Sequence, residues 1–338
     1  MTYDHYIALD WAQKNMAIAR MTAHSDKISA VDVPASIKEL QLYLIGLKGK
    51  KVLTFEETNT AQWLYTELRE YVDEIIVCDP YRNRLLSEGP KTDKIDAKKL
   101  VLLLRGNLLK AVFHSGDDFI LLRKLVSGYQ DVIKSGVRLK NQRDAMFRST
   151  GKKVHNTSNL DQPVEQFVLS GLNRNIDSYE LEKARYQKEF GTLCKKNGTL
   201  RNLKSVPGIG EIGAVTLAAI VVDPKRFKSK GDFLSYCGLV NLEKMSGGKS
   251  YGQKRPRYCR QIKNVFKIAA LSNINSGPNQ PLRLYHNFLI EKKQYSDFNA
   301  RHALARRIAV LTLGMWKSGK SFHQQGAPVC SEPAAIIL

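Results

Sequence analysis

Apolar and polar residues follow two different periods in the first hundred positions of the chain. Short apolar runs of the kind that form strands stand at residues 6–9, 16–21, 28–33, 52–55 and 75–78. Ser36 and Glu39 form a capping box, and the apolar residues from Ile37 to Leu47 then recur at helical spacing. A second helix is predicted over residues 61–71. Three strands followed by alternating helices and strands predict a mixed α/β sheet.

The rest of the chain is predicted to be mainly helical. Apolar residues keep a helical period over residues 93–105, 118–147 and 164–194, which predicts long helices and a coiled-coil arm. Residues 149–163 are rich in Ser, Thr, Asn, Gly and Lys and are typical of a loop. We therefore expect an α/β domain at 1–110, a helical linker at 111–198, a helical domain at 199–323 and a poorly ordered tail at 324–338.

Composition limits the class of protein. The chain has 338 residues, of which 43% are hydrophobic, and this excludes global disorder. It lacks the run of about 18 apolar residues that a membrane span needs, and residues 1–10 do not have the regions of a signal peptide. Five scattered cysteines without C-x-x-C spacing indicate neither a disulfide framework nor a zinc site. These features predict a soluble, cytoplasmic protein that does not act at a membrane.

The net charge of +21 is distributed unevenly. Residues 1–100 carry 14 basic and 15 acidic side chains, so 39 of the 53 basic and 17 of the 32 acidic side chains lie in residues 101–338. A strongly basic segment favours a polyanionic partner, because each phosphate that it neutralises releases counterions. Nucleic acid is the leading candidate. A merely solvated basic surface is one alternative, and an anionic membrane is a weaker one because the charges are not concentrated in one amphipathic segment.

Four carboxylates stand where an α/β sheet would present them to a cleft. Asp10 and Glu56 each follow a buried apolar run directly, and strand ends commonly line a site. Asp93 and Asp96 are three positions apart, which places both on one face of a helix. A set of oxygen ligands without nearby His or Cys suits Mg²⁺ and metal-assisted phosphoryl transfer. Taken singly, each acid is also explained as a cap, a surface residue or a helix-start residue.

Two glycine-containing segments resemble phosphate loops. VPGIGEIG at 206–213 contains G-x-G-x-x-G, but Pro207 and the polar stretch before it exclude a dinucleotide fingerprint. Its glycines Gly208 and Gly210 fit a helix-hairpin-helix turn that binds a nucleic-acid phosphate, or a plain helical turn. GMWKSGKS at 314–321 matches the ATP-binding pattern G-x-x-x-x-G-K-[ST], yet only 17 residues follow it, too few for the remaining parts of such a site. We expect residues 301–320 to form a basic amphipathic helix instead.

Ser246 stands in a Ser-Gly-Gly-Lys segment surrounded by cations. A serine beside two glycines has an accessible hydroxyl, and neighbouring cations would stabilise a phosphodiester under attack. The basic residues proposed to bind nucleic acid are Lys249, Lys254, Arg255, Arg257 and Arg260. By itself the segment is also typical of a solvated turn.

Taken in this order, these segments resemble the DEDD transposases of IS110-type insertion sequences, a family that includes the Piv-type DNA invertases and the bridge-RNA-guided recombinases. The resemblance spans about residues 6–322. It is carried by Asp10, Glu56 in EETN, KTDKIDA at 91–97, VPGIG at 206–210, the RF pair at 226–227, CGLV at 237–240 and SGGK at 246–249.

This resemblance implies a RuvC-like, ribonuclease-H-like N-terminal domain in which Asp10, Glu56, Asp93 and Asp96 bind Mg²⁺. It implies that Ser246 is the nucleophile that joins covalently to a DNA strand end. A structured noncoding RNA, the bridge RNA, would pair with target and donor DNA. The active site would be composed between protomers of a homo-oligomer, a dimer or tetramer, associated with the bacterial nucleoid. Asn59 departs from the glycine usual in the family, which leaves Glu57 as an alternative to Glu56.

Three functions follow from these features. The leading hypothesis is a site-specific recombinase or transposase of a mobile element that cuts and rejoins DNA through Ser246, assisted by Mg²⁺ and the four acids. The second is a RuvC-like, Mg²⁺-dependent nuclease or junction resolvase in which water attacks. The third is a scaffold that binds nucleic acid without catalysis.

Overall fold

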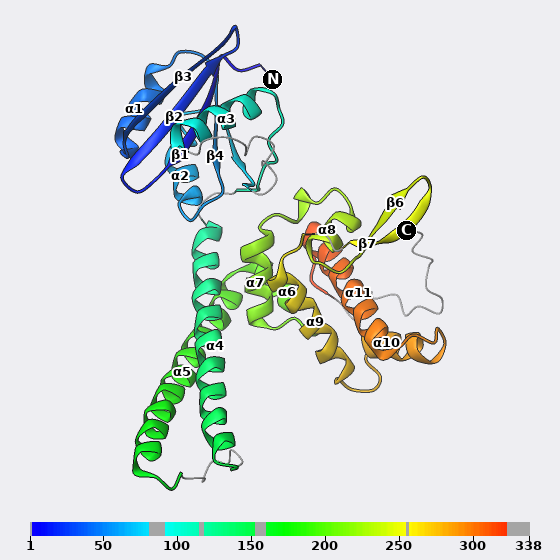
Figure 1. Cartoon of the computed structure of the whole chain (residues 1–338). Coiled ribbons are helices and arrows are strands. Elements are labelled where there is room, and N and C mark those ends of the chain that lie inside the picture. The colour runs from blue at the N-terminus through cyan, green and yellow to red at the C-terminus, as the bar shows by residue number, and fades with distance from the viewer. Residues whose placement is uncertain (1, 81–91, 115–117, 153–159, 255–256, 323–338) are drawn as a thin grey trace. The chain divides into compact units, whose positions relative to one another are not determined.

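The computed structural model describes residues 2–80, 92–114, 118–152, 160–254 and 257–322. The chain divides into two compact units, Met1–Asp117 and Asp118–Leu338, which are described one at a time (Figure 1). Within the described ranges, every helix is too short or too polar to cross a membrane. The finer division expected at residues 110, 198 and 323 stays a prediction.

The N-terminal unit is built on a five-stranded sheet with the order β3-β2-β1-β4-β5. β1 and β3 each pair antiparallel with β2, whereas β1, β4 and β5 are parallel neighbours. The strands are β1 (His5–Trp11), β2 (Asn15–Thr22), β3 (Ser25–Pro34), β4 (Lys51–Glu56) and β5 (Glu74–Cys78). All the strands expected from the apolar runs are present, so the predicted mixed α/β sheet is confirmed. The sheet also fits the ribonuclease-H-like fold expected for this unit.

Helices cover both faces of this sheet, and alternate residues of β1 point to opposite sides. Ile7 and Leu9 pack in one buried cluster with α1 (Ile37–Gly46) and α2 (Ala61–Leu68). Ala8 lies on the other face in a cluster with α3 (Asp93–Arg105) (Figure 1). Ala8, Ala17 and Ala19 on the α3 side of β1 and β2 are small, and this lets the helix lie close to that part of the sheet.

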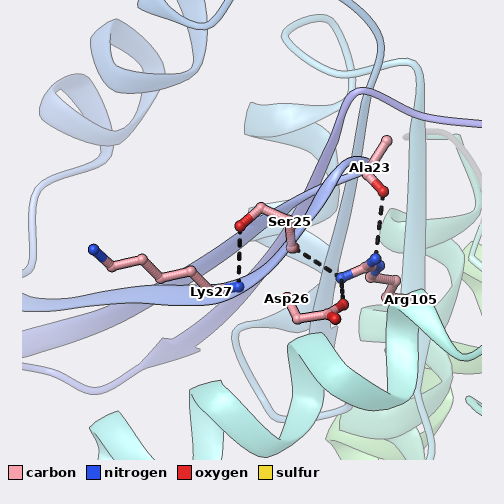
Figure 2. Close-up of polar contacts among 5 residues, drawn as sticks. All are labelled: Ala23, Ser25, Asp26, Lys27 and Arg105. Atoms are coloured by element: carbon pink, nitrogen blue, oxygen red, sulfur yellow. Dashed lines mark hydrogen bonds and ion pairs between the residues drawn. The ribbon is translucent and has the colours of Figure 1, made fainter.

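Arg105 fixes the direction in which α3 crosses the sheet. Its guanidinium donates to the carbonyl oxygens of Ser25, at 2.9 Å, and Ala23, at 3.3 Å, and pairs with Asp26 at 2.8 Å (Figure 2). Ala23 lies in the turn after β2, and Ser25 and Asp26 begin β3. This turn lies beside the amino end of β1, because Ala23 N donates to Asp4 O. The last turn of α3 is therefore held at the amino end of β1, and the helix runs antiparallel to that strand.

The C-terminal unit begins with a long helical hairpin, α4 (Asp118–Ser149) and α5 (Pro163–Lys196), as the sequence predicts (Figure 1). Shorter elements follow: α6 (Gly198–Lys204), α7 (Glu211–Val221), a 3-10 turn (Pro224–Arg226), α8 (Lys230–Tyr236), β6 (Leu242–Ser246), β7 (Lys249–Lys254), α9 (Arg260–Ile274), α10 (Pro281–Glu291) and α11 (Asp297–Ser318).

The core of this unit surrounds α7. Seven of the 11 residues of α7 are buried, as expected for a helix that is apolar on most sides. The same cluster takes in Val126 and Tyr129 from α4 and Phe190 and Cys194 from α5. The base of the helical hairpin therefore shares its core with the helices that follow it.

Two expectations for the C-terminal unit have definite outcomes. Residues 314–318 belong to α11, which ends at Gly319 in the left-handed conformation with φ 71°. The predicted helix is therefore confirmed, and residues 314–318 of the GMWKSGKS segment lie in it. The unit was expected to be mainly helical, and residues 242–254 depart from this expectation by forming the β6–β7 hairpin. Alternation is a weak signal in this segment, because every residue of both strands is exposed and neither face is apolar.

Replacing Arg105 with alanine is expected to lower the free energy of unfolding of the N-terminal unit by about 1–2 kcal/mol, because two backbone carbonyls lose their donor. Asp26→Ala is the matched control and should change it little, since the Asp26 side chain is 96% exposed. Urea unfolding followed by tryptophan emission measures both variants. A Trp316→Phe background leaves only Trp11 and Trp63, which lie in this unit. Equal losses for the two variants would show that the surface ion pair matters more than the carbonyl contacts.

Candidate functional site

Asp10 and Glu56 lie side by side at the carboxyl edge of the sheet. The parallel register of β1 and β4 pairs Leu9 with Phe55, so these two acids come next on neighbouring strands, about 4.8 Å apart. Both point to the face that α3 covers, because Leu9 and Phe55 belong to the cluster on the opposite face. Asp10 is half-buried and Glu56 is exposed.

Asp93 and Asp96 lie in the first turn of α3, which begins at its cap Thr92. Ala97 and Leu100, which follow them at helical spacing, are buried against the sheet, so both acids lie toward the sheet side of the helix. From Arg105 back to Asp93, α3 extends about 18 Å, close to the roughly 17 Å from His5 to Asp10 along β1.

Since Arg105 is held at the amino end of β1, the first turn of α3 reaches the carboxyl edge. The structure therefore brings the four predicted acids to one edge and one face of the sheet. A second observation agrees with this placement. Ala97 shares a buried cluster with Cys78, and Cys78 is the register partner of Glu56.

The donor set of this acidic edge fits Mg²⁺ in chemistry. Carboxylate oxygens are the ligands that hard divalent cations prefer, and the start of a helix favours negative charge. In the ranges that the structure covers, no three His, Cys, Asp or Glu side chains are yet close enough together to hold a metal ion. Mutual repulsion keeps like charges apart at short range, so convergence of these side chains would depend on a cation that neutralises them.

Glu57, the alternative to Glu56, has a partner of its own. Its carboxylate is hydrogen-bonded to Nε2 of His114, whose Nδ1 lies 3.1 Å from Gln62 Oε1. The His114 side chain is 4% exposed, and its ring packs against Tyr65 with centroids 5.5 Å apart. Glu57 is therefore engaged on the α2 side, opposite to the face toward which Glu56 points. His114 was not among the predicted residues, because only the fold brings it to Glu57.

Asn59 in the same segment raises no conformational difficulty. The described residues other than glycine that have a positive φ are Asn107, Val222 and Gln294. Asn59 therefore has an ordinary backbone conformation, and the turn does not require the glycine that the family usually has there.

Ser246 lies at the tip of the β6–β7 hairpin, directly opposite Lys249. Only Gly247, with φ 56°, and Gly248, with φ 77°, separate the two residues. Two-residue hairpin turns of type I′ need a positive φ at both central positions, which glycine provides without strain. The turn therefore exposes the serine hydroxyl and places a lysine across from it, where side-chain Cβ atoms are about 5 Å apart.

The other cations that were predicted to bind nucleic acid follow this hairpin tip in the sequence. Lys254 lies at the far end of the hairpin, opposite Leu242. Arg257 and Arg260 are exposed just before and at the start of α9, and Arg255 lies outside the described residues. The structure thus brings Lys249 to Ser246 and places Lys254 away from it.

The turn between α6 and α7 is seated on α9, and its two glycines have different roles. Gly208 has φ 83°, and a Cβ there would lie 2.5 Å from Ala269 O. Asn273, which is 4% exposed, donates to Pro207 O at 2.8 Å and so fixes the turn. Gly210 is the cap of α7, has no side-chain cap bond and faces open space. Gly208 is therefore needed for packing, whereas Gly210 leaves the helix start accessible.

Comparison with known proteins matches both units. Residues 7–151, which include the four acids, match a family described as a transposase and labelled as the DEDD transposase of IS110 type. Residues 200–287, which include the VPGIG turn and Ser246, match the transposase family IS116/IS110/IS902.

Two Sinorhizobium fredii proteins are similar to this chain. The candidate transposase y4qE is 25% identical over 210 residues, which is 57% of this chain and 50% of the relative. The candidate transposase y4pF/y4sB is 27% identical over 128 residues, which is 37% of this chain and 33% of the relative. The matches thus span half or less of the length of these relatives.

Gly208→Ala is expected to destabilise the C-terminal unit by about 2–3 kcal/mol or more, because the new methyl group would collide with backbone and the residue would keep a left-handed conformation. Gly210→Ala is the matched control and should change stability by less than about 1 kcal/mol, since its φ of −80° and the open space suit alanine. Thermal unfolding monitored through Trp316 compares the two. Similar melting temperatures for both variants would contradict this account of the turn.

Proposed function

We propose, because the chain belongs to the IS110 family of transposases, that it cuts and rejoins DNA strands of a mobile element. Ser246 would be the nucleophile, and Asp10, Glu56, Asp93 and Asp96 would hold the Mg²⁺ that assists it. The proposal depends above all on the placement of four acids from β1, β4 and α3 at one edge and face of the sheet. If these acids served only as helix caps or surface charges, nothing would require all four to lie at the same edge.

The chemistry assigned to Ser246 is transesterification. Its Oγ attacks a phosphorus of the DNA backbone, a phosphoserine bond forms, and the bond to the leaving sugar oxygen breaks as that oxygen takes up a proton. Attack by the hydroxyl of another strand reverses these steps and frees the serine. One phosphate ester replaces another at each step, so exchange needs no ATP. The exposed hairpin tip supports this role, because a nucleophile there is accessible to a large substrate.

Lys249 would stabilise the negative charge that the phosphate carries during attack, from its place across the turn from Ser246. Bound Mg²⁺ would supply charge neutralisation at the reacting phosphate. The acids and the serine belong to different units of the chain. Part of the proposal is therefore that the complete site is composed between protomers of a dimer or tetramer.

The nucleic-acid partners are target DNA, donor DNA and a structured bridge RNA. The charge of residues 101–338, with 39 basic against 17 acidic side chains, supports tight binding of phosphate backbones. Backbone contacts carry little sequence information. Base pairing to a guide RNA would then select the target, as in other guided systems. A bacterial cytoplasmic location associated with the nucleoid follows from these partners.

Ser246→Ala and Asp10→Ala are each expected to lower the rate of strand transfer by about a thousandfold or more, because one removes the nucleophile and the other a metal ligand. Binding of DNA and RNA should persist in both variants. A plasmid assay that carries the element ends and the noncoding RNA measures recombination, and gel mobility measures binding. Recombination at the normal rate by Ser246→Ala would remove the serine from the mechanism.

The same proteins separate transesterification from hydrolysis. Wild-type protein incubated with labelled DNA and denatured should leave a covalent protein–DNA adduct, and Ser246→Ala should leave none. Free 5′-phosphate ends without an adduct would instead indicate a nuclease or junction resolvase.

Glu56→Gln and Glu57→Gln are expected to differ, because Glu57 is bonded to His114. Glu56→Gln should lower strand transfer by about a hundredfold or more and raise the Mg²⁺ concentration needed. Glu57→Gln should retain most activity while lowering the melting temperature, since it weakens a contact to a buried histidine. Mg²⁺ titration of strand transfer, paired with thermal unfolding, tests both variants. The reverse pattern would make Glu57 the ligand.

A further inference from the structure

The C-terminal unit contains a groove of about 780 Å³ that the proposed chemistry does not use. It opens between α4, α5, the start of α7 and α9, and its volume is in the range of small-ligand sites. Its apolar walls include Ile133, Ile209 and Ile268. The ring of Tyr129, in the same lining, is packed edge-on against Phe190 with centroids 5.2 Å apart, so this wall is fixed.

Four residues with side-chain amides line this groove: Gln130, Gln187, Gln261 and Asn264. The Gln187 amide is hydrogen-bonded to Tyr129. Each amide offers donors and an acceptor, which is the pattern that pairs with the edges of nucleobases. The carboxylate of Glu211, also in the lining, is bonded to Lys204 Nζ at 2.6 Å, so its charge is compensated. Apolar walls with amide groups suit a planar, neutral ligand whose edge carries both donors and acceptors.

One end of the groove suits a phosphate. The first turn of α7 begins at Gly210 without a side-chain cap, and the guanidinium-bearing Arg260 lines the same groove. Backbone N–H groups at a helix start, together with an arginine, favour an anionic group. A base in the groove and its own phosphate at this end would form one nucleotide.

The charge next to the groove gives independent evidence for an anionic chain. Lys263 and Lys267 follow Arg260 on one side of α9 at helical spacing. With Arg306 of α11 they surround His302, whose pKa is lowered by burial first and then by repulsion from Lys263, Arg306 and Lys267. His302 thus lies in a net positive field, which would attract an external polyanion. The Lys263 ammonium itself lies over the Tyr258 ring, 4.5 Å from its centroid.

We propose that the groove receives an unpaired nucleobase of a nucleic-acid strand whose phosphates run along Arg260, Lys263 and Lys267. This inference rests on the nucleic-acid partner in the proposed function. It adds a site away from the acidic edge and the serine hairpin, and it assigns the ligand class as a single extruded or single-stranded nucleotide. Holding one unpaired nucleotide would fix the register of the strand on the protein.

Binding can be measured without strand transfer by using full-length Ser246→Ala protein. The probes are a labelled duplex with one bulged adenosine and the same duplex with an abasic bulge, each made as DNA and as RNA. Ser246→Ala protein with an unaltered groove should bind the base-containing probe about tenfold more tightly than the abasic one. Asn264→Leu and Gln130→Leu should each remove most of that preference and leave the abasic probe unaffected. The Asn264 side chain is exposed, so its replacement should not disturb folding.

A second pair of variants tests the path of the phosphates. Lys267→Gln should weaken binding of both probes alike and reduce the slope of log affinity against log salt by about one. Lys230→Gln removes one exposed lysine at the start of α8 and should leave the slope unchanged. An equal slope for the two variants would overturn the path along α9.

The outcomes separate this inference from the proposed function. Tight binding without preference for the base, or equal losses on both probes for Asn264→Leu, overturns the groove site alone. Absence of binding to any of the four probes overturns the nucleic-acid partner, and the groove site with it. A base preference in only the DNA or only the RNA probes supports the groove site and identifies which strand supplies the nucleotide.

Discussion

The register between β1 and β4 is the constraint on which the acidic edge depends. A slip of one residue would turn either Asp10 or Glu56 to the opposite face of the sheet. Buried side chains on both faces prevent that slip, because Ile7 and Leu9 fill one core and Ala8 the other. Asp10 and Glu56 are more than forty residues apart in the sequence, and this register places their carboxylates at the same edge of the sheet. The direction of α3, fixed at its far end by Arg105, then adds Asp93 and Asp96.

The serine is positioned by a different kind of constraint. Its turn is fixed by two glycines with positive φ, while the strands that carry it are exposed along their whole length. Two-stranded hairpins without a packed face are only marginally stable in water. The local geometry of Ser246 and Lys249 is thus set by the turn, whereas the place of the hairpin relative to a substrate is left to binding. In the proposed mechanism, Ser246 therefore reacts only when the rest of the site is assembled around the hairpin.

Sequence patterns predicted the elements of the N-terminal unit well because each strand packs apolar side chains against a core. Asp10 and Glu56 were selected as candidate ligands because they directly follow apolar runs, and Asp93 and Asp96 because helical spacing relates them. Such patterns could not predict three features of the structure. The exposed β6–β7 hairpin has no apolar period, His114 meets Glu57 only in the fold, and the amides of the groove come from α4, α5 and α9. Contacts between distant segments leave no local signal, and polar side chains such as Gln130 and Asn264 are typical of any surface.

The uneven charge of the chain separates binding from chemistry in the proposed function. Affinity for phosphate backbones would arise from the basic segment 101–338 and needs no divalent cation. Chemistry depends on acids that repel those same phosphates until a cation neutralises them. If the acids lay among the lysines and arginines of α9, each would form ion pairs that weakened both functions. With the acids on one unit and the cations on another, the protein can hold nucleic acid before the reacting phosphate enters the acidic edge. A nucleotide bound in the groove would fix the strand register before the reacting phosphate enters the acidic edge. An error in alignment can still be reversed at that stage, because the strand can dissociate.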